Sequence, residues 1–306
     1  MTVAARLDRH LLDVDALRRD DIEHILETAA EMKAARQARR SLGHLRAETV
    51  GLLFYEPSTR TRVSFELAAR ALGAEVVDLA VGSSSVVKGE SLVDTLVTLE
   101  RLAISVLVIR HQAAGVPYLA ARVTRCRIVN AGDGAHAHPT QALLDAFTLR
   151  ERLGALDGRK IAIVGDLVHS RVARSNLHAL TKLGASVWLT GPATLTRGFE
   201  RWPGATLVPT LEDALRDADA VMALRIQRER QDGGALPSLG EYTRRWGLTL
   251  DRMRLARPGA LVLHPGPMQE GIEIAADLAA SERSVIRDQV ANGVAVRMAV
   301  FALLSA

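Results

Sequence analysis

A dense group of hydroxyl and guanidinium side chains lies in the segment E56-P-S-T-R-T-R-V-S-F-E66. Ser58 or Thr59 can cap a helix that begins here, and the first turn of that helix leaves several backbone N–H groups without partners. Together with the helix dipole and the guanidinium of Arg60, these donors form a suitable seat for a phosphate. The segment is not a P-loop, because the glycines and the lysine of that motif are missing. The alternative is a capped surface helix, which accounts for Ser58 but not for the number of donors.

Two further loops of the first half carry polar or charged residues after apolar runs. The segment G82-S-S-S-V-V-K-G-E90 is rich in Gly and Ser and contains Lys88. It suits a mobile lid that contacts phosphate as well as it suits a solvated, flexible loop. Arg110 and His111 directly follow S105-V-L-V-I109. This pair is a weaker indication of a site, because any strand must end in polar residues.

The segment N130-A-G-D-G-A-H-A-H-P-T-Q141 allows two interpretations. Its carboxylate and imidazole side chains are possible metal ligands: Asp133, His136 and His138. A fourth ligand is missing and a loop of this kind is flexible, so no metal site is predicted. The preferred interpretation places Pro139 in the first turn of a helix, with His138 and Gln141 directed at a ligand.

A polar loop of the second half, G165-D-L-V-H-S-R-V-A-R174, again joins an apolar run to a helical pattern and contains Arg171. It lacks the G-x-G-x-x-G pattern, so dinucleotide binding is not predicted. Arg225 and Gln227 occupy alternating positions after another apolar run, so both side chains should lie on the same side of the chain. Arginine forks match carboxylates, and separate arginines suit a dicarboxylate. The alternative is a charged, solvated loop.

The segment His264-Pro265-Gly266-Pro267 follows the last apolar run before the C-terminal helical pattern. The two prolines that flank Gly266 should hold the backbone extended and rigid. An extended backbone would present its carbonyl groups to an N–H group of a ligand. An ordinary loop is the alternative.

Short apolar runs alternate with longer amphipathic segments, which predicts βαβ units and an α/β fold with two doubly wound parallel sheets. The predicted strands of the first half are 50–54, 75–79, 105–109 and 127–130, and its helices are 61–72, 91–102 and 115–122. The second half has predicted strands at 160–165, 185–190, 220–224 and 260–263, and helices at 171–183 and 211–216. A helix over 139–153 joins the halves, and a closing helix is predicted by apolar residues at helical spacing: Val290, Val294, Met298 and Phe301. Ligands bind outside the carboxyl ends of such strands, so the polar loops described above are expected to form the site.

The composition is that of a globular protein large enough for two domains. The chain has 306 residues, of which 48% are hydrophobic and 24% charged. Cys126 is the only cysteine, so no intrachain disulfide forms and a reducing, cytoplasmic location is expected. No signal peptide and no membrane-spanning run is predicted. A net charge of +4 and 4% aromatic residues do not favour a nucleic-acid binder, although the isoelectric point of about 9.6 suggests one.

Taken in order along the chain, these loops resemble the carbamoyltransferase family, in its aspartate-specific branch. In the first half, S58-T-R-T-R62 resembles the carbamoyl phosphate motif of the family, and H138-P-T-Q141 resembles its second signature. The segment K88-G-E90 resembles the end of its swinging loop. In the second half, Arg225-Ile226-Gln227 and His264-Pro265-Gly266-Pro267 are similar to the aspartate-specific motifs. Ornithine relatives instead carry S-M-G and H-C-L-P motifs, which this sequence lacks. The resemblance covers essentially the whole chain.

The resemblance implies transfer of a carbamoyl group from carbamoyl phosphate to L-aspartate in pyrimidine synthesis, with no cofactor and no metal. It implies that the phosphate is held by Ser58, Thr59, Arg60 and Thr61. The carbamoyl oxygen is expected to contact Thr61, Arg110 and His138, and the carbamoyl NH2 group Gln141 and the backbone of Gly266 and Pro267. The expected aspartate ligands are Arg171, Arg225, Gln227 and Lys88, and the residues expected from a neighbouring subunit are Ser84 and Lys88. The expected catalytic residues among these are Arg60, Thr61, Arg110 and His138.

The resemblance also implies a homotrimer, and it leaves open whether regulatory chains or a dihydroorotase join a larger assembly. It predicts a carbamoyl phosphate domain at 1–149 with the last helix, 288–306, and an aspartate domain at 150–287. One departure is Glu270, which stands where relatives often have an arginine. Its negative charge near a dianionic substrate is expected to affect the strength of aspartate binding. The alternatives are a carbamoyltransferase for another amino acid such as ornithine and a non-catalytic scaffold subunit; no nucleic-acid or membrane partner is expected.

Overall fold

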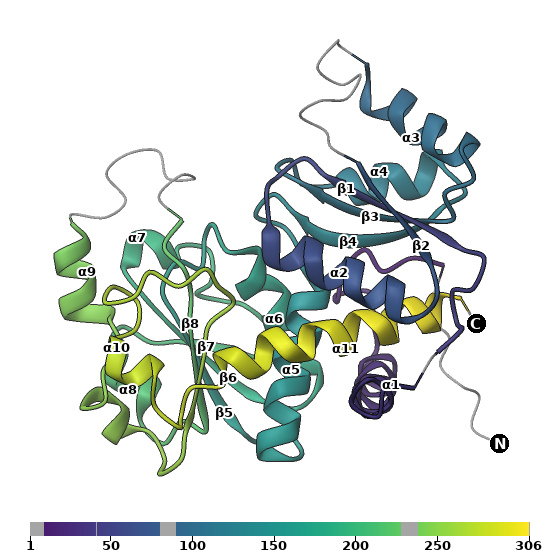
Figure 1. Cartoon of the computed structure of the whole chain (residues 1–306). Coiled ribbons are helices and arrows are strands. Elements are labelled where there is room, and N and C mark those ends of the chain that lie inside the picture. The colour runs from purple at the N-terminus through teal and green to yellow at the C-terminus, as the bar shows by residue number, and fades with distance from the viewer. Residues whose placement is uncertain (1–8, 41, 80–89, 228–237, 306) are drawn as a thin grey trace. The chain divides into compact units, whose positions relative to one another are not determined.

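The computed structural model describes residues 9–40, 42–79, 90–227 and 238–305. The chain divides into two compact units, Met1–Phe147 with Val290–Ala306 and Thr148–Gln289. The division falls inside the helices α5 (Pro139–Leu153) and α11 (Ile286–Leu304), so the last helix ends in the first unit (Figure 1). None of the helices in the described ranges has the length and apolar content that a bilayer crossing requires.

The first unit is built on a parallel sheet of four strands: β1 (Thr49–Phe54), β2 (Glu75–Leu79), β3 (Val106–His111) and β4 (Arg127–Asp133). The order in the sheet is β2-β1-β3-β4. The strands β1, β3 and β4 are buried along most of their length, as strands covered on both faces must be, whereas the edge strand β2 is largely exposed. The doubly wound parallel sheet predicted for the first half is confirmed.

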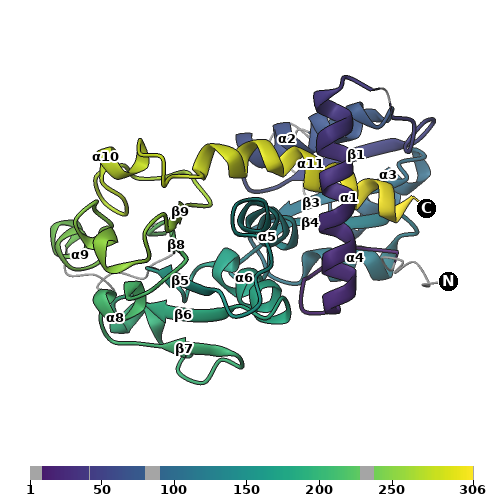
Figure 2. The same cartoon turned by 90° about the horizontal axis from the view of Figure 1, so that it is seen from below.

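Helices cover both faces of this sheet, as Figures 1 and 2 show: α1 (Arg19–Gln37), α2 (Thr59–Ala71), α3 (Leu92–Arg101) and α4 (Val116–Val123). Leu96 of α3 and Ala120 of α4 pack in one apolar cluster with Leu107 of β3, so α3 and α4 share a face. On the other face, α2 lies beside the end of α11, and the rings of Phe65 and Phe301 are 5.8 Å apart.

The second unit repeats this architecture with five parallel strands: β5 (Lys160–Val164), β6 (Ser186–Thr190), β7 (Ala205–Leu207), β8 (Ala220–Ala223) and β9 (Leu261–Leu263). Their order is β7-β6-β5-β8-β9. The helices of this unit are α6 (Arg171–Lys182), α7 (Ala193–Thr196), α8 (Leu211–Leu215), α9 (Leu239–Trp246) and α10 (Ala276–Ala279), with a 3-10 helix at Arg252–Leu255. Leu211 and Leu215 of α8 pack with Val164 and Val221 in the core, so the sheet predicted for the second half is also confirmed.

Several elements of the structure were not predicted. They are α1, α7, β7, α9, α10 and the 3-10 helix at Arg252–Leu255. The predicted closing helix is present as α11, and of the four residues that predicted it Val290 is 53% exposed, whereas Val294, Met298 and Phe301 are buried. The difference lies along the helix and not around it. Val290 is only about 20° from the buried Phe301 around the axis. Of residues 286–291, however, only Gln289 is buried, whereas residues 292–302 are all buried.

Each sheet reverses its strand order beside its first strand, since β2 and β3 flank β1 and β6 and β8 flank β5. In open α/β sheets, ligands bind outside the carboxyl ends of the strands at such a point. The loops after β1, β3 and β4 therefore form the candidate site of the first unit. The loops after β5, β8 and β9 form that of the second.

Candidate active site

The loop after β1 leads into α2, whose N-terminus has no side-chain cap. Ser58 occupies the N-cap position in an extended conformation, yet its hydroxyl makes no capping hydrogen bond. The first-turn N–H groups of a helix have no intrahelical partner, so they and the positive end of the dipole remain available to an anion. Thr61 is buried beneath this turn, whereas Thr59 and Arg60 are exposed. Partial burial of its guanidinium lowers the pKa of Arg60.

Two other polar residues of the same helix serve structure instead. Arg62 forms an ion pair with Asp78 of β2. The hydroxyl of Ser64 donates to the backbone carbonyl of Thr61 at 2.9 Å. Arg62 and Ser64, which have no predicted contact with a ligand, therefore have structural partners within the protein.

Arg110, the next-to-last residue of β3, is held in place by two acceptors. Its Nη2 atom donates to Oε1 of Glu56 at 2.6 Å, and its Nη1 atom donates to the carbonyl of Ala131 at 3.3 Å. The Arg110 and Glu56 side chains are 11% and 22% exposed. Glu56 was not among the predicted site residues, because its partner Arg110 is 54 residues away in the sequence. The pair orients the Arg110 guanidinium beside the loop that opens α2.

The loop after β4 ends in α5, which begins at Pro139 as the preferred interpretation predicts. His138 is 4% exposed and its carbonyl accepts the backbone N–H of Gln141 at 3.0 Å. The side chain of Gln141 is also buried, and its Nε2 atom donates to Oδ1 of Asp145 one turn later at 2.9 Å. The sequence prediction did not include Asp145, which has no exposed surface.

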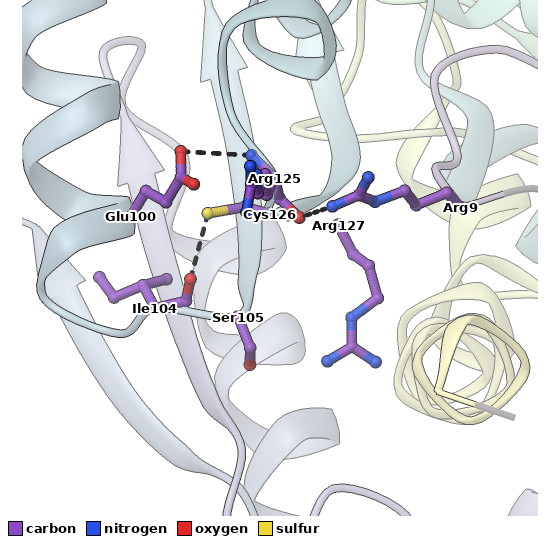
Figure 3. A pocket seen from close by; sticks show the side chains of 7 residues that line it. All are labelled: Arg9, Glu100, Ile104, Ser105, Arg125, Cys126 and Arg127. Atoms are coloured by element: carbon purple, nitrogen blue, oxygen red, sulfur yellow. Dashed lines mark hydrogen bonds between the residues drawn. The ribbon is translucent and has the colours of Figure 1, made fainter.

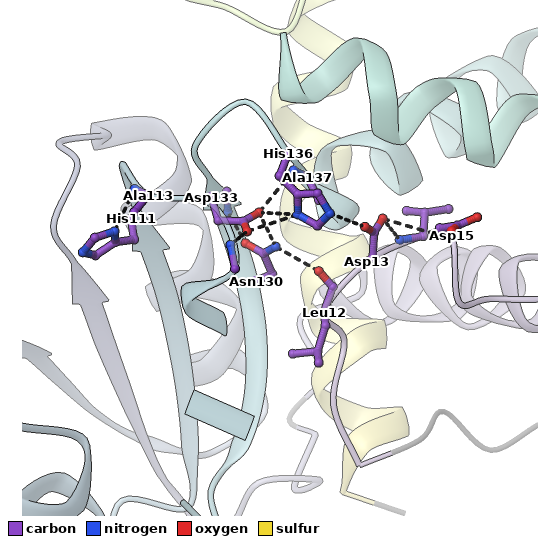
Figure 4. A network of polar contacts seen from close by, with 12 residues as sticks. Leu12, Asp13, Asp15, His111, Ala113, Asn130, Asp133, His136 and Ala137 are labelled. Carbon is purple, nitrogen blue, oxygen red and sulfur yellow. Dashed lines mark hydrogen bonds and ion pairs between the residues drawn. The ribbon is translucent and has the colours of Figure 1, made fainter. Parts of the chain in front are cut away.

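The acidic and imidazole residues of this loop form a hydrogen-bonded network instead of a metal site (Figure 4). Nδ1 of His136 lies 3.1 Å from Oδ2 of Asp133, and its Nε2 lies 3.3 Å from Oδ2 of Asp13. The buried Asp133 carboxylate also accepts the backbone N–H groups of Gly115 and Ala137 at 2.7 and 3.1 Å. Over the described ranges of the chain, no group of three or more His, Cys, Asp or Glu residues could hold a metal ion. The network therefore fixes the loop that precedes His138.

In the second unit, the loop after β5 is organised by Asp166, which has no exposed surface. Its carboxylate lies 2.9 Å from Nδ1 of His169 and accepts the His169 backbone N–H at 3.2 Å. Ser170 then caps α6 by accepting the N–H of Ala173 at 3.1 Å. Arg171, the first residue of α6, is 5% exposed.

The loop after β8 places Arg225 and Gln227 as the alternation predicts. Ile226 between them is fully buried, whereas both neighbours are partly exposed. The side-chain Nε2 of Gln227 donates to the carbonyl of His169 at 3.0 Å, which ties this loop to the loop after β5. Arg225 also acts electrostatically on Glu273, whose pKa is raised because the carboxyl group is buried.

Glu273, which the sequence prediction missed, joins the loop after β8 to the loop after β9. Its carboxylate accepts the N–H of Ile226 at 3.1 Å and that of Gln269 at 2.6 Å. The expectation of an extended backbone after β9 is wrong: Gly266 has φ 68, and the Gly266–Pro267 peptide is cis. The turn is closed by Nδ1 of His264, which accepts the Gly266 N–H at 2.8 Å. Only glycine adopts such a φ readily, so the loop bends where the prolines predicted a straight segment.

The remaining predicted residues, Ser84 and Lys88, lie outside the described residues. A pocket of about 310 Å³ lies at the amino ends of β3 and β4 and is lined by Arg9, Glu100, Ile104, Ser105, Arg125, Cys126 and Arg127 (Figure 3). The guanidinium of Arg127 is engaged by Glu48 and by the Ser305 hydroxyl at 3.1 Å, and that of Arg9 by the carbonyl of Arg125. The pocket is thus at the end of the sheet opposite to the polar loops.

Comparison with known proteins identifies one family over nearly the whole chain. The description "Aspartate/ornithine carbamoyltransferase, carbamoyl-P binding domain" matches residues 9–151, and "Aspartate/ornithine carbamoyltransferase, Asp/Orn binding domain" matches residues 157–304. The aspartate carbamoyltransferase catalytic subunit of Roseiflexus sp. (strain RS-1) is 53% identical over 302 residues, which are 97% of this chain and 95% of that protein. The corresponding subunit of Sorangium cellulosum (strain So ce56) is 53% identical over 299 residues, covering 97% and 93% of the two chains.

Solved structures show the same likeness in three dimensions. Aspartate transcarbamoylase from Trypanosoma cruzi in complex with carbamoyl phosphate and aspartate superposes with a TM-score of 0.88 at 31% identity, covering 98% of this chain and 96% of that one. Ornithine carbamoyltransferase from Pyrococcus furiosus superposes with a TM-score of 0.86 at 28% identity, covering 96% of each chain. The fold is thus shared by both branches, and the acceptor must be decided by the side chains of the second unit.

Proposed function

Because the chain belongs to the aspartate/ornithine carbamoyltransferase family, we propose that it transfers the carbamoyl group of carbamoyl phosphate to the α-amino group of L-aspartate. The products are N-carbamoyl-L-aspartate and phosphate, and the reaction is the second step of de novo pyrimidine synthesis. The relatives at 53% identity are named aspartate carbamoyltransferase catalytic subunits. The structure of the Trypanosoma cruzi relative with carbamoyl phosphate and aspartate supports the same pair of substrates.

One observation favours aspartate over ornithine as the acceptor. The loops after β5 and β8 carry Arg171 and Arg225, whose guanidinium groups suit the two carboxylates of aspartate. The carboxylates of the same region, Asp166 and Glu273, have no exposed surface and accept backbone N–H groups. They are therefore occupied by the protein itself and are poorly placed to bind the second ammonium group of ornithine.

The first unit supplies the groups for carbamoyl phosphate. We assign the phosphate to the N-terminus of α2, with Ser58, Thr59, Arg60 and Thr61. Arg110 and His138 donate to the carbamoyl oxygen, where negative charge develops when the neutral amine attacks the carbamoyl carbon. The bond from that carbon to the phosphate oxygen then breaks, and the departing phosphate accepts the proton that the amine loses. Catalysis by this scheme consists of positioning and oxyanion stabilisation, without a covalent enzyme intermediate.

The acceptor half of the scheme uses Arg171, Arg225 and Gln227 for the carboxylates, and the backbone of Gly266 and Pro267 for the carbamoyl NH2 group. Glu270 is exposed in this region, so its charge is screened by water and is expected to weaken aspartate binding only slightly.

We further propose a homotrimer that works in the cytoplasm. The support is the resemblance, in which Ser84 and Lys88 act in the site of a neighbouring subunit, and the single cysteine Cys126. Light scattering during size-exclusion chromatography measures the mass directly, and full activity in a monomer would contradict the proposal. Regulatory chains or a dihydroorotase would appear as co-purifying partners.

The proposed reaction is tested by assaying carbamoylation of a panel of amino acids with carbamoyl phosphate. We expect ureido product from aspartate and none from ornithine or N-acetylated amines. Product from ornithine alone would overturn the acceptor assignment. Absence of product from every amine, in a correctly folded protein that still binds phosphate, would favour a scaffold subunit.

A further inference from the structure

The side-chain amide of Gln141 has a fixed orientation that the reaction scheme does not by itself explain. Its Nε2 atom donates to Oδ1 of Asp145 at 2.9 Å. An ionised carboxylate can only accept hydrogen bonds, so the NH2 end of the amide must face Asp145. The carbonyl end, Oε1, consequently points away from Asp145 and is the end that can meet a donor on a ligand.

A buried arginine of the last helix acts electrostatically on this carboxylate. Arg297 of α11 is 3% exposed, and its guanidinium lies over the Phe65 ring at 4.7 Å from the centroid. Burial lowers the pKa of Arg297 to about 9, while the charge of Asp145 acts in the opposite direction and that of Arg110 adds to the lowering. A pKa of about 9 leaves the guanidinium charged at neutral pH, so a buried positive charge lies within electrostatic reach of both Asp145 and Arg110.

The helix that carries Arg297 makes room for this guanidinium. Gly293 lies one turn earlier on α11, and a Cβ atom at that position would come within 2.5 Å of Nη1 of Arg297. A glycine inside a helix is destabilising relative to alanine. Here the glycine has a packing reason, because a larger residue would push the guanidinium out of its place.

We propose that Asp145 and Arg297 are positioning residues that lock the Gln141 amide with Oε1 toward the ligand, so that the site selects a phosphorylated acyl group bearing an NH2 donor. The charges of Arg297 and Asp145 attract each other, and Asp145 holds Nε2 of Gln141. The Gln141 carbonyl then accepts from the carbamoyl NH2 group, whereas the methyl group of acetyl phosphate offers it no donor. This inference rests on the proposed function, since it concerns how the site recognises carbamoyl phosphate.

The selectivity follows from the cost of an unpaired polar group. A site built to hydrogen-bond an NH group rejects an analogue that lacks the group, because the buried acceptor is then left unpaired. If the amide were free to flip, it would present its own NH2 group, and the site would lose this discrimination. Both ligands carry a phosphate, so the seat at the N-terminus of α2 cannot distinguish them.

The test compares carbamoyl phosphate with acetyl phosphate in the full-length enzyme. The measured quantities are kcat/KM for carbamoyl phosphate at saturating aspartate and the competitive inhibition constant of acetyl phosphate. The key variant is Asp145→Asn, because the new amide can donate to Oε1 of Gln141 and so permits the flipped orientation. We expect kcat/KM for carbamoyl phosphate to fall by about 10- to 100-fold, with the inhibition constant of acetyl phosphate unchanged within about twofold.

A second pair of variants keeps the test decisive if Asp145→Asn does not fold. Gly293→Ala displaces the Arg297 guanidinium without removing any polar group and should shift the preference in the same direction by a smaller factor. Gly240→Ala in α9 is the matched control, because a Cβ there meets nothing closer than 3.8 Å. The control should keep the wild-type preference.

The outcomes separate this inference from the proposed function. A wild-type enzyme that binds acetyl phosphate as tightly as carbamoyl phosphate contradicts the proposed recognition itself. A wild-type preference that persists in Asp145→Asn and Gly293→Ala overturns the inference alone. Equal weakening of both ligands also overturns it, since that result indicates a general structural role for Asp145 and Arg297.

Discussion

Replacing Glu56 by glutamine removes a charge from the pair that orients Arg110 while it keeps the shape of the side chain. The Nη2–Oε1 distance is 2.6 Å, and both side chains are largely shielded from water, with 11% and 22% exposure. A hydrogen bond between charged groups in such surroundings contributes about 1.5–3 kcal/mol. In Glu56→Gln the guanidinium keeps its contact with the Ala131 carbonyl at 3.3 Å but loses its stronger acceptor.

The expected result is a split between turnover and binding. If most of the lost interaction energy served to position Arg110 for the transition state, kcat falls about 10- to 100-fold, which corresponds to about 1.4–2.8 kcal/mol. Affinity for inorganic phosphate should stay equal or increase, because the variant removes a negative charge near an anion site. Steady-state kinetics with saturating aspartate gives kcat, and calorimetric titration with phosphate gives the affinity.

Glu66→Gln on α2 is the matched control. Glu66 pairs with Arg70 at 3.1 Å, but these side chains are 32% and 57% exposed, and such surface pairs contribute less than about 1 kcal/mol. The control should therefore leave kcat, phosphate affinity and thermal unfolding unchanged. Wild-type turnover in Glu56→Gln would refute the role assigned to the pair, and so would a loss of turnover fully explained by a lower melting temperature.

Four further expectations follow from the same contacts. Arg60→Ala, Arg110→Ala and His138→Ala should each lower kcat about 10²–10³-fold, and near wild-type turnover in all three would disprove the site. Arg62→Met breaks an exposed pair with Asp78, so denaturant unfolding should show a loss of at most about 1 kcal/mol while kcat is unchanged. Burial raises the pKa of Glu273; relative to Glu273→Gln, the wild-type free energy of unfolding should be highest below pH 4.5 and decline as pH rises through the raised pKa, as urea titrations at several pH values would show. Cys126 is buried and its thiol pKa is raised by burial, so a disulfide reagent should modify it only after unfolding, and rapid labelling of the native protein would contradict this.

The elements that the sequence predicted well are those in which consecutive residues are apolar and buried. The apolar runs around β1, β3 and β5 are continuous because both faces of these strands are covered. β7 has three residues, none of them fully buried, so it leaves no such run. α1 was missed although Ile22, Ile25, Leu26, Ala29 and Met32 are buried at helical spacing, so its signal was present in the sequence.

The candidate site divides in the same way. Residues proposed to act from a helix start or from alternating positions after a strand, such as Ser58 or Arg225, can be recognised locally. Glu56, Asp145 and Glu273 could not be assigned in this way, because each acts through a partner whose position depends on the folded chain. Glu273, for example, accepts N–H groups from two different loops. Pattern reasoning also failed at Gly266, where the glycine's φ of 68 overrides the stiffness of its neighbouring prolines.

Burial, rather than residue type, separates the arginines of this arginine-rich chain. Arg62 and Arg70 form exposed pairs, in which water already stabilises the charge. Arg110, Arg171 and Arg297 are largely removed from water, and a guanidinium in that state is costly unless negative charge or hydrogen bonds offset the lost hydration. Glu56 offsets this cost at Arg110, and Asp145 acts in the same sense at Arg297. Glu56 contacts Arg110 and Asp145 contacts Gln141, so the charges that make these burials tolerable also fix two groups that we propose to bind carbamoyl phosphate.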